Sequence, residues 1–219
     1  MPRLLFEKKD NAIWISHLDL MRVFQRAFKR AGLPLTHTQG FTPRPSVSIA
    51  LPLSVGVDSC CELLDFDLEE YSVPMEEIRS RLNAVLSAGI RVLDVYEQGR
   101  KIRDLSLLRC KVTLEYDEGV PEGAVAKIDG LLHSPQVIVP KKTKNGMQDQ
   151  DIISMIRSIC VTQAGERVVE LEALVCCQNP TLNPAQIILA IDMYLPELKP
   201  SHATVSRLEI YDSNETIFR

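Results

Sequence analysis

The residues best suited to chemistry lie near the start of the chain, around an imidazole. His17 follows Ser16 at the expected start of a helix, where its ring can act as a general acid or base or contact a ligand. The alternative is a histidine at the edge of the core, hydrogen-bonded to backbone. Ser16 and Asp19 could form a nucleophile and base, but their spacing is typical of a helix cap, which accounts for both.

Three arginines follow at intervals of four residues, at Arg22, Arg26 and Arg30. This spacing places them on one face of a helix, where they could track a phosphate backbone. The alternative is a solvated face on which Asp19 pairs with Arg22. The sequence leaves both interpretations open.

A 14-residue connection, Leu33 to Ser46, comes next and is long for a compact domain. Prolines hold such a segment extended, and an aromatic ring beside a cation can stack on and clamp a base. The alternative is that Phe41 plugs the core. We expect a binding cleft in which His17 joins these loop residues: Gln39, Gly40, Phe41 and Arg44.

Charge is distributed unevenly along the chain. Residues 1–46 carry eight basic and three acidic side chains, a net charge of +5, whereas the rest of the chain carries −9 and the whole chain −4. A local basic surface on an acidic protein suits phosphates or an acidic partner. The sequence therefore concentrates the expected function in its N-terminal segment.

Cysteine placement and hydropathy argue against several classes of protein, namely disulfide-bonded, metal-binding and membrane-spanning ones. Four of the six cysteines form two adjacent pairs in strand-like runs, Cys60–Cys61 and Cys176–Cys177, and such pairs suit neither a relaxed disulfide nor a cluster. His37, His133 and His202 are isolated, so we expect no metal site and no cofactor bound by the chain itself. No apolar run approaches the roughly 20 residues of a membrane span, and no signal peptide is recognisable. We expect a cytoplasmic protein.

Hydrophobic periodicity and turn signals organise the chain into two halves. The first half is expected to run strand, helix, strand, strand, helix, strand, with its first helix from the Ser16 cap to about Ala31. The second half repeats this order with an extra helix near residues 151–159. The order predicts an α+β fold of two tandem ferredoxin-like (βαββαβ) lobes. Their expected bounds are residues 1–100 and 105–212, with residues 213–219 as a tail.

Several runs in the first 70 residues carry a resemblance to a known family. They include Ile15 to Arg22, Arg30 to Pro34 and Gln39 to Pro45. These runs resemble the bacterial family of radical SAM-linked proteins, a domain of unknown function. Members are encoded beside, or fused to, B12-binding radical SAM proteins, so the resemblance implies such a partner. The family often has Asn and His where this chain has Thr42 and Arg44.

Three functions remain open from the sequence. The first is a non-catalytic accessory protein that binds RNA, or a nucleotide-like anion, and presents it to a B12-binding radical SAM enzyme. The second is an RNA-processing or RNA-modifying enzyme that uses His17. The third is a protein–protein adaptor whose basic face docks on an acidic partner. The absence of cluster-type cysteine spacing argues against radical chemistry by this chain itself.

Overall fold

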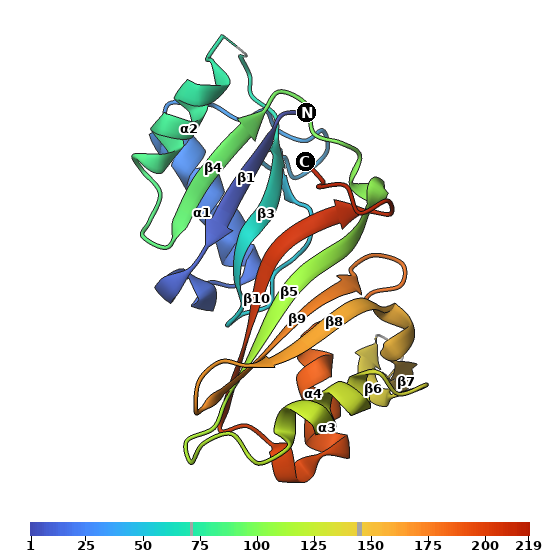
Figure 1. The fold of residues 1–219 in the computed structure, drawn as a ribbon. Helices are drawn as coiled ribbons and strands as arrows, with labels where there is room; N and C mark the ends of the chain where they lie inside the picture. The colour runs from blue at the N-terminus through green and yellow to red at the C-terminus, as the bar shows by residue number, and fades with distance from the viewer. Residues whose placement is uncertain (71, 144–145) are drawn as a thin grey trace. The chain divides into compact units, whose positions relative to one another are not determined.

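The computed structural model describes residues 1–70, 72–143 and 146–219, which form two compact units. The first unit comprises Met1–Asp104 with Phe218–Arg219, and the second comprises Leu105–Ile217. Both units combine strands with helices, so the chain has an α+β fold, with four α-helices among the described residues (Figure 1). None of these helices has the length and hydrophobicity needed to cross a membrane.

Among its described residues, the first unit contains four strands and two α-helices. In chain order they are β1 (Arg3–Lys8), α1 (His17–Arg30), β2 (Val47–Ile49), β3 (Asp58–Phe66), α2 (Met75–Asn83) and β4 (Ile90–Tyr96). The strands pair antiparallel in the order β4-β1-β3, and β2 also pairs with β3. Helices α1 and α2 lie on the same face of this sheet (Figure 1). Short 3-10 helices span Asp10–Trp14 and Ile102–Asp104.

Helix α1 is fixed by its cap and by its apolar face. Ser16 Oγ accepts a hydrogen bond from the Asp19 N–H at 3.2 Å, as the capping pattern predicted. Phe24 and Phe28 are completely buried, and the Phe24 ring meets Phe6 of β1 edge-on at 4.7 Å between centroids. This packing leaves the opposite, basic face of α1 exposed to solvent.

A buried arginine ties β1 to β3 and to the end of the chain. The Arg3 guanidinium donates to both carboxylate oxygens of Asp65, at 2.6 and 3.0 Å, and lies 5.5 Å from the centre of the Phe218 ring. A Cβ at Gly99 would lie 2.4 Å from Arg3 Cζ, so any larger residue there would have to displace the Arg3 guanidinium. Residues 213–219 were expected to form a tail, but Phe218 is completely buried.

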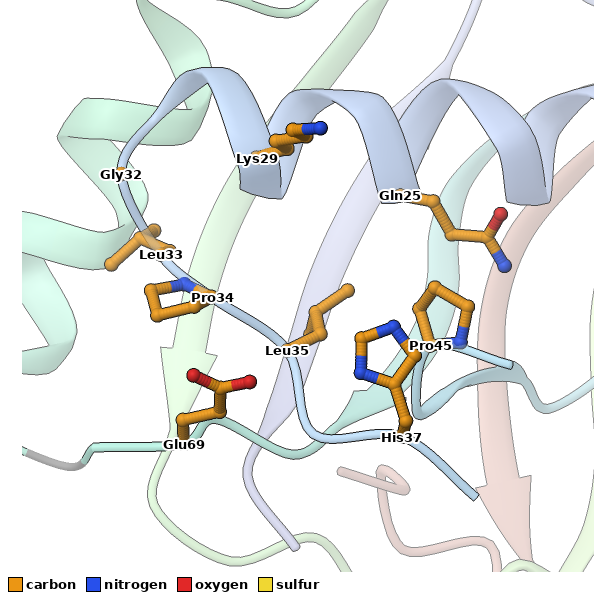
Figure 2. Close-up of a pocket in the computed structure, with 9 residues that line it drawn as sticks. All are labelled: Gln25, Lys29, Gly32, Leu33, Pro34, Leu35, His37, Pro45 and Glu69. Atoms are coloured by element: carbon orange, nitrogen blue, oxygen red, sulfur yellow. The ribbon is translucent and has the colours of Figure 1, made fainter. Parts of the chain in front are cut away.

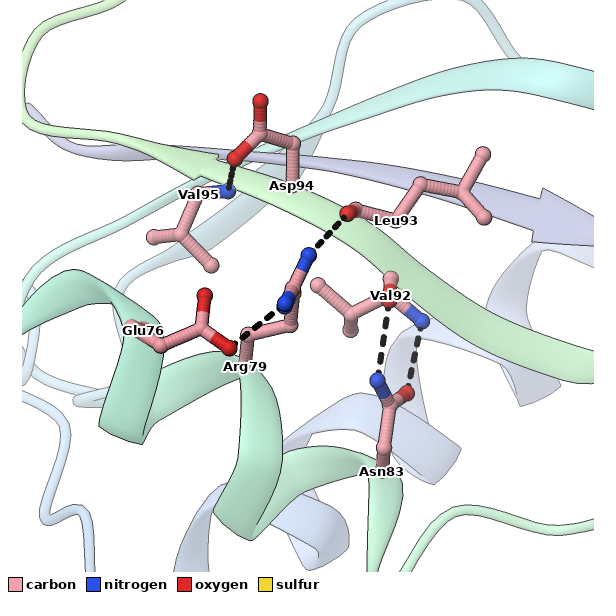
Figure 3. A network of polar contacts seen from close by, with 7 residues as sticks. All are labelled: Glu76, Arg79, Asn83, Val92, Leu93, Asp94 and Val95. Carbon is pink, nitrogen blue, oxygen red and sulfur yellow. Dashed lines mark hydrogen bonds and ion pairs between the residues drawn. The ribbon is translucent and has the colours of Figure 1, made fainter.

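Side chains of α2 occupy the outer edge of β4 (Figure 3). The Asn83 carboxamide donates to Val92 O at 2.9 Å and accepts from Val92 N–H at 2.8 Å, while Arg79 donates to Leu93 O at 3.1 Å. An uncovered edge strand offers free backbone groups to other chains. These contacts satisfy that part of the edge from within the unit.

The second unit contains six strands and two helices among its described residues. In chain order they are β5 (Leu105–Glu115), α3 (Ala124–Leu132), β6 (Ile138–Thr143), β7 (Gly146–Asp151), β8 (Ile156–Gln163), β9 (Val168–Cys176), α4 (Ala185–Tyr194) and β10 (His202–Asp212). Four strands pair antiparallel in the order β10-β5-β9-β8, and β6 pairs separately with β7. Short 3-10 helices span Ile153–Met155 and Pro196–Leu198.

The extra helix predicted near residues 151–159 was wrong. The segment instead contains the end of β7, a 3-10 turn and the first half of β8. The spacing of Ile152, Met155, Ile156 and Ile159 suits an amphipathic helix, but the segment is rich in β-branched side chains that favour a strand. Pairing with β9 resolves this conflict in favour of the strand.

All six cysteines are free thiols in the structure. Burial raises the pKa of both Cys110 and Cys177 to about 12, because a thiolate is poorly stabilised away from water. Cys160, in contrast, is exposed on β8. Burial therefore keeps Cys110 and Cys177 in the protonated, unreactive form.

The contacts of Asn83 generate a stability prediction. Asn83→Ala should lower the free energy of unfolding by roughly 1–3 kcal/mol, because Val92 loses partners for both its N–H and its C=O. Urea unfolding followed by circular dichroism measures the change. The control is Arg81→Ala in the same helix, which removes only an exposed ion pair with Glu77 and should cost less than about 1 kcal/mol. Equal losses for the two variants would contradict a special role for Asn83.

Candidate functional site

The connection between α1 and β2 folds into a short hairpin-like arm, residues 36–46. The Ser46 N–H donates to Thr36 O at 2.8 Å, and the Thr38 N–H donates to Arg44 O at 2.9 Å. In return, the Arg44 N–H donates to Thr38 Oγ1 at 3.1 Å. These bonds hold the two sides of the arm together and leave residues 39–43 as its tip.

The tip carries the loop residues that the sequence predicted as a binding element. Gln39, Gly40 and Phe41 are all exposed, and Phe41 is as accessible as in an isolated chain, with a relative exposure of 110%. The core-plug alternative for Phe41 is therefore excluded. Gly40 has φ of +135°, a conformation that side chains rarely adopt. The exposed Arg44 guanidinium has no partner among the described residues.

The base of the arm is anchored to the segment that follows β3. The Thr36 N–H donates to Asp67 O at 3.0 Å, and the Thr36 hydroxyl donates to the Asp67 carboxylate at 2.7 Å. The Asp67 N–H donates to Ser46 O at 3.1 Å. Asp67 thus holds both sides of the arm at once, which fixes the arm where it leaves the sheet.

A pocket of about 390 Å³ lies between α1 and the chain that enters the arm (Figure 2). The side chains of Leu33 and Leu35 are buried in its wall. The backbone of Glu69 is held against the pocket by its N–H, which donates to Pro34 O at 3.0 Å. The full lining is Gln25, Lys29, Gly32, Leu33, Pro34, Leu35, His37, Pro45 and Glu69.

The polar side chains of this pocket are free to meet a ligand. Gln25, Lys29, His37 and Glu69 make no side-chain hydrogen bond or ion pair with any residue that the structure describes. An amide, a cation, an imidazole and a carboxylate around an apolar wall are typical of a small-ligand site. Within the described ranges, no cluster of three or more His, Cys, Asp or Glu side chains could hold a metal ion.

Sequence reasoning missed this pocket. It treated His37 as isolated and gave no role to Gln25 or Glu69. Glu69 comes from beyond β3, far along the chain from the helix it faces, and no spacing rule joins it to α1. Lys29 was expected only as one of the basic residues on the exposed face of the helix.

The three arginines of α1 differ in their surroundings. Arg22 pairs with Asp19 at 2.7 Å, and Arg30 donates to Val85 O at 2.8 Å. The hydrogen bond from the Ser16 hydroxyl lowers the pKa of the Asp19 carboxyl, and the hydrogen bond from Arg22 lowers it further. Arg26 is exposed and has no partner within the described part of the chain. Arg26 is thus the arginine of the stripe best placed to accept an outside anion.

His17 occupies the first position of α1 and is half-buried. Its Nδ1 is out of contact with solvent and has no hydrogen-bond partner among the described residues. The pocket lies along the later part of α1, beside Gln25 and Lys29, and its lining includes neither His17 nor the tip of the arm. Within the described residues, no hydrogen bond joins His17 to the arm. The pocket is therefore a different site from the cleft expected around His17.

The anchor at Asp67 generates a prediction about the arm. Thr36→Val removes a hydroxyl that donates to a carboxylate, a bond worth roughly 1.5–3 kcal/mol. The amides of Thr38 and Ser46 should therefore exchange with solvent roughly tenfold faster or more, as measured by hydrogen–deuterium exchange. Thr42→Val at the exposed tip is the matched control and should leave these rates unchanged. Unaltered exchange in Thr36→Val would show that the backbone bonds alone hold the arm.

One solved structure resembles this chain in its fold. A chain of a Cbf5–Nop10–Gar1 complex superposes with a TM-score of 0.52 at 11% identity, over 95% of this chain and 48% of that one. A chain of the archaeal box H/ACA sRNP Nop10–Cbf5 complex gives 0.49 at 10% identity, over 94% and 46%. The chain spans about half the length of these structures' chains. At such low identity the likeness concerns the fold alone.

Comparison with curated proteins gives no match. A family model, in contrast, matches residues 2–184, which include both the arm and the pocket. That family is described as uncharacterized protein conserved in bacteria. The match covers most of the sequence, and the chain therefore belongs to this bacterial family, DUF2344.

Proposed function

We propose that the first unit binds single-stranded RNA, or a nucleotide-like anion, through the arm and the adjoining pocket. The observation that carries the proposal is Phe41, fully exposed at the tip of an arm that is hydrogen-bonded along both sides. A solvent-exposed phenylalanine forgoes roughly 1.5–3 kcal/mol of burial. Stacking of a base on such a ring contributes about 1–3 kcal/mol to binding, which is comparable to the burial energy that the exposed side chain lacks.

Charge around the arm supports an anionic ligand. Arg44 follows the tip, and Arg26 and Lys29 are neighbours on the exposed face of α1, three residues apart. None of these three cations is neutralised by a described residue. Lys29 also lines the pocket. A backbone phosphate held by Arg26 would therefore bring the attached nucleotide toward the pocket.

The wider biological proposal extends to a partner. The sequence resemblance to radical SAM-linked proteins supports an accessory role, in which this chain presents its ligand to a B12-binding radical SAM enzyme. The partner would hold the cofactors and perform the reaction, and this chain would bind none of its own. Such a role places the protein in the bacterial cytoplasm.

Strand order supports the finer description of the fold. The first unit runs βαββαβ, with its strands paired as β4-β1-β3-β2. The second unit has the matching order β10-β5-β9-β8 once the β6–β7 pair is set aside. We propose that both units are ferredoxin-like and that β6–β7 is an insertion in the second.

The role of Phe41 gives a binding prediction. Phe41→Ala should weaken binding of a fluorescent single-stranded RNA roughly tenfold, as measured by anisotropy at fixed salt, because one stacking surface is lost. The control is Met147→Ala, which removes an exposed apolar side chain from the second unit and should leave affinity unchanged. The proposal fails if the unmodified protein binds no RNA, or if both variants bind as it does.

A further inference from the structure

The pocket beside α1 combines features that a phosphate site would not have. Glu69 lines it, and a carboxylate repels phosphate and accepts hydrogen bonds only. Buried Leu33 and Leu35 give the wall an apolar surface. A flat, uncharged ring with N–H donors on its edge fits this set of groups. Within an RNA ligand, such a ring is a nucleobase turned out of its stack.

The carboxylate distinguishes between the four bases. The Glu69 side chain makes no hydrogen bond or ion pair with a described residue, so both of its oxygens can accept. Guanine presents two adjacent donors on its Watson–Crick edge, the N1–H and the N2 amine. Adenine, cytosine and uracil each place an acceptor beside their single donor group. Only guanine offers a carboxylate two parallel hydrogen bonds without an opposing lone pair.

The opposite wall supplies complementary donors. Figure 2 shows the Glu69 carboxylate directed toward α1, the helix that carries Gln25 and Lys29. An ammonium group donates only, and the O6 and N7 atoms of guanine accept only. Lys29 therefore matches the edge of guanine that Glu69 leaves unmatched. The Gln25 amide can donate or accept beside it.

From this arrangement we infer that the pocket holds a single unstacked guanine of the bound RNA. The inference rests on the RNA binding proposed above and names the base that the site selects. Glu69 accepts from N1–H and the N2 amine, Lys29 donates to the O6 or N7 side, and Leu35 and Pro45 contact the ring. Phe41 and the exposed cations then act on neighbouring nucleotides without regard to base.

The test uses three eight-nucleotide oligouridylates that carry guanosine, inosine or adenosine at one central position. Inosine lacks only the N2 amine. The full-length protein should bind the guanosine oligomer roughly tenfold more tightly than the adenosine oligomer, with inosine weaker than guanosine by a similar factor, since one correct base contact of this kind contributes about 1–3 kcal/mol. Glu69→Gln should abolish the preference for guanosine over inosine.

A matched control lies next to Glu69 in the chain. Glu70 is also exposed but does not line the pocket, so Glu70→Gln makes the same charge change and should keep the preference. Equal affinity for all three oligomers would overturn the guanine assignment while RNA binding itself stands. If Glu69→Gln still prefers guanosine over inosine, that preference arises in another part of the chain and the assignment to this pocket is overturned. No binding of any oligomer would overturn the RNA-binding proposal and the guanine assignment together.

Discussion

The candidate site depends on one junction, in which Asp67 hydrogen-bonds both sides of the arm. Its carbonyl and carboxylate accept from Thr36, and its N–H donates to Ser46. The chain leaving α1 is thereby held against the end of β3. Without this junction, a 14-residue connection would have no fixed path, and neither the pocket wall nor the exposed tip would have a defined place.

The same junction brings together residues that are distant in sequence. Leu35 bridges to Leu68, and Glu69 is the next residue, so the segment after β3 that anchors the arm also carries the carboxylate of the pocket. Helix α1 contributes the opposing wall, because its buried face leaves Gln25 and Lys29 directed outward. The site therefore combines a packed helix, an anchored loop and the segment that follows β3.

Local signals in the sequence predicted the local features well. The cap at Ser16, the apolar face of α1 and the stop at Gly32 follow from propensity and periodicity, and all three appear in the structure. Residues 151–159 show the limit of such signals. Helical spacing and β-branched composition conflict there, and pairing with β9 decides the outcome. Cross-strand pairing is long-range information that a single sequence does not display.

Site residues show the same limit. Phe41 and Arg44 attracted attention because their types and their proline-rich setting suggest recognition. Glu69 lines the same pocket as residues of α1 only because of the path the chain takes after β3, and the bridge of His37 to Pro45 is likewise a pairing within the folded arm. Similarly, the ion pair of Arg22 with Asp19 followed from helix spacing, whereas the bond from Arg30 to Val85 required the packing of the whole unit.

The central claim is that the arm and the pocket contact RNA directly. Ultraviolet crosslinking of the full-length protein to a single-stranded RNA, followed by mass spectrometry of the crosslinked peptides, tests it most directly. The account predicts crosslinks in the peptide that contains His37 and Phe41. Crosslinks confined to the second unit, with none in residues 36–46, would contradict it.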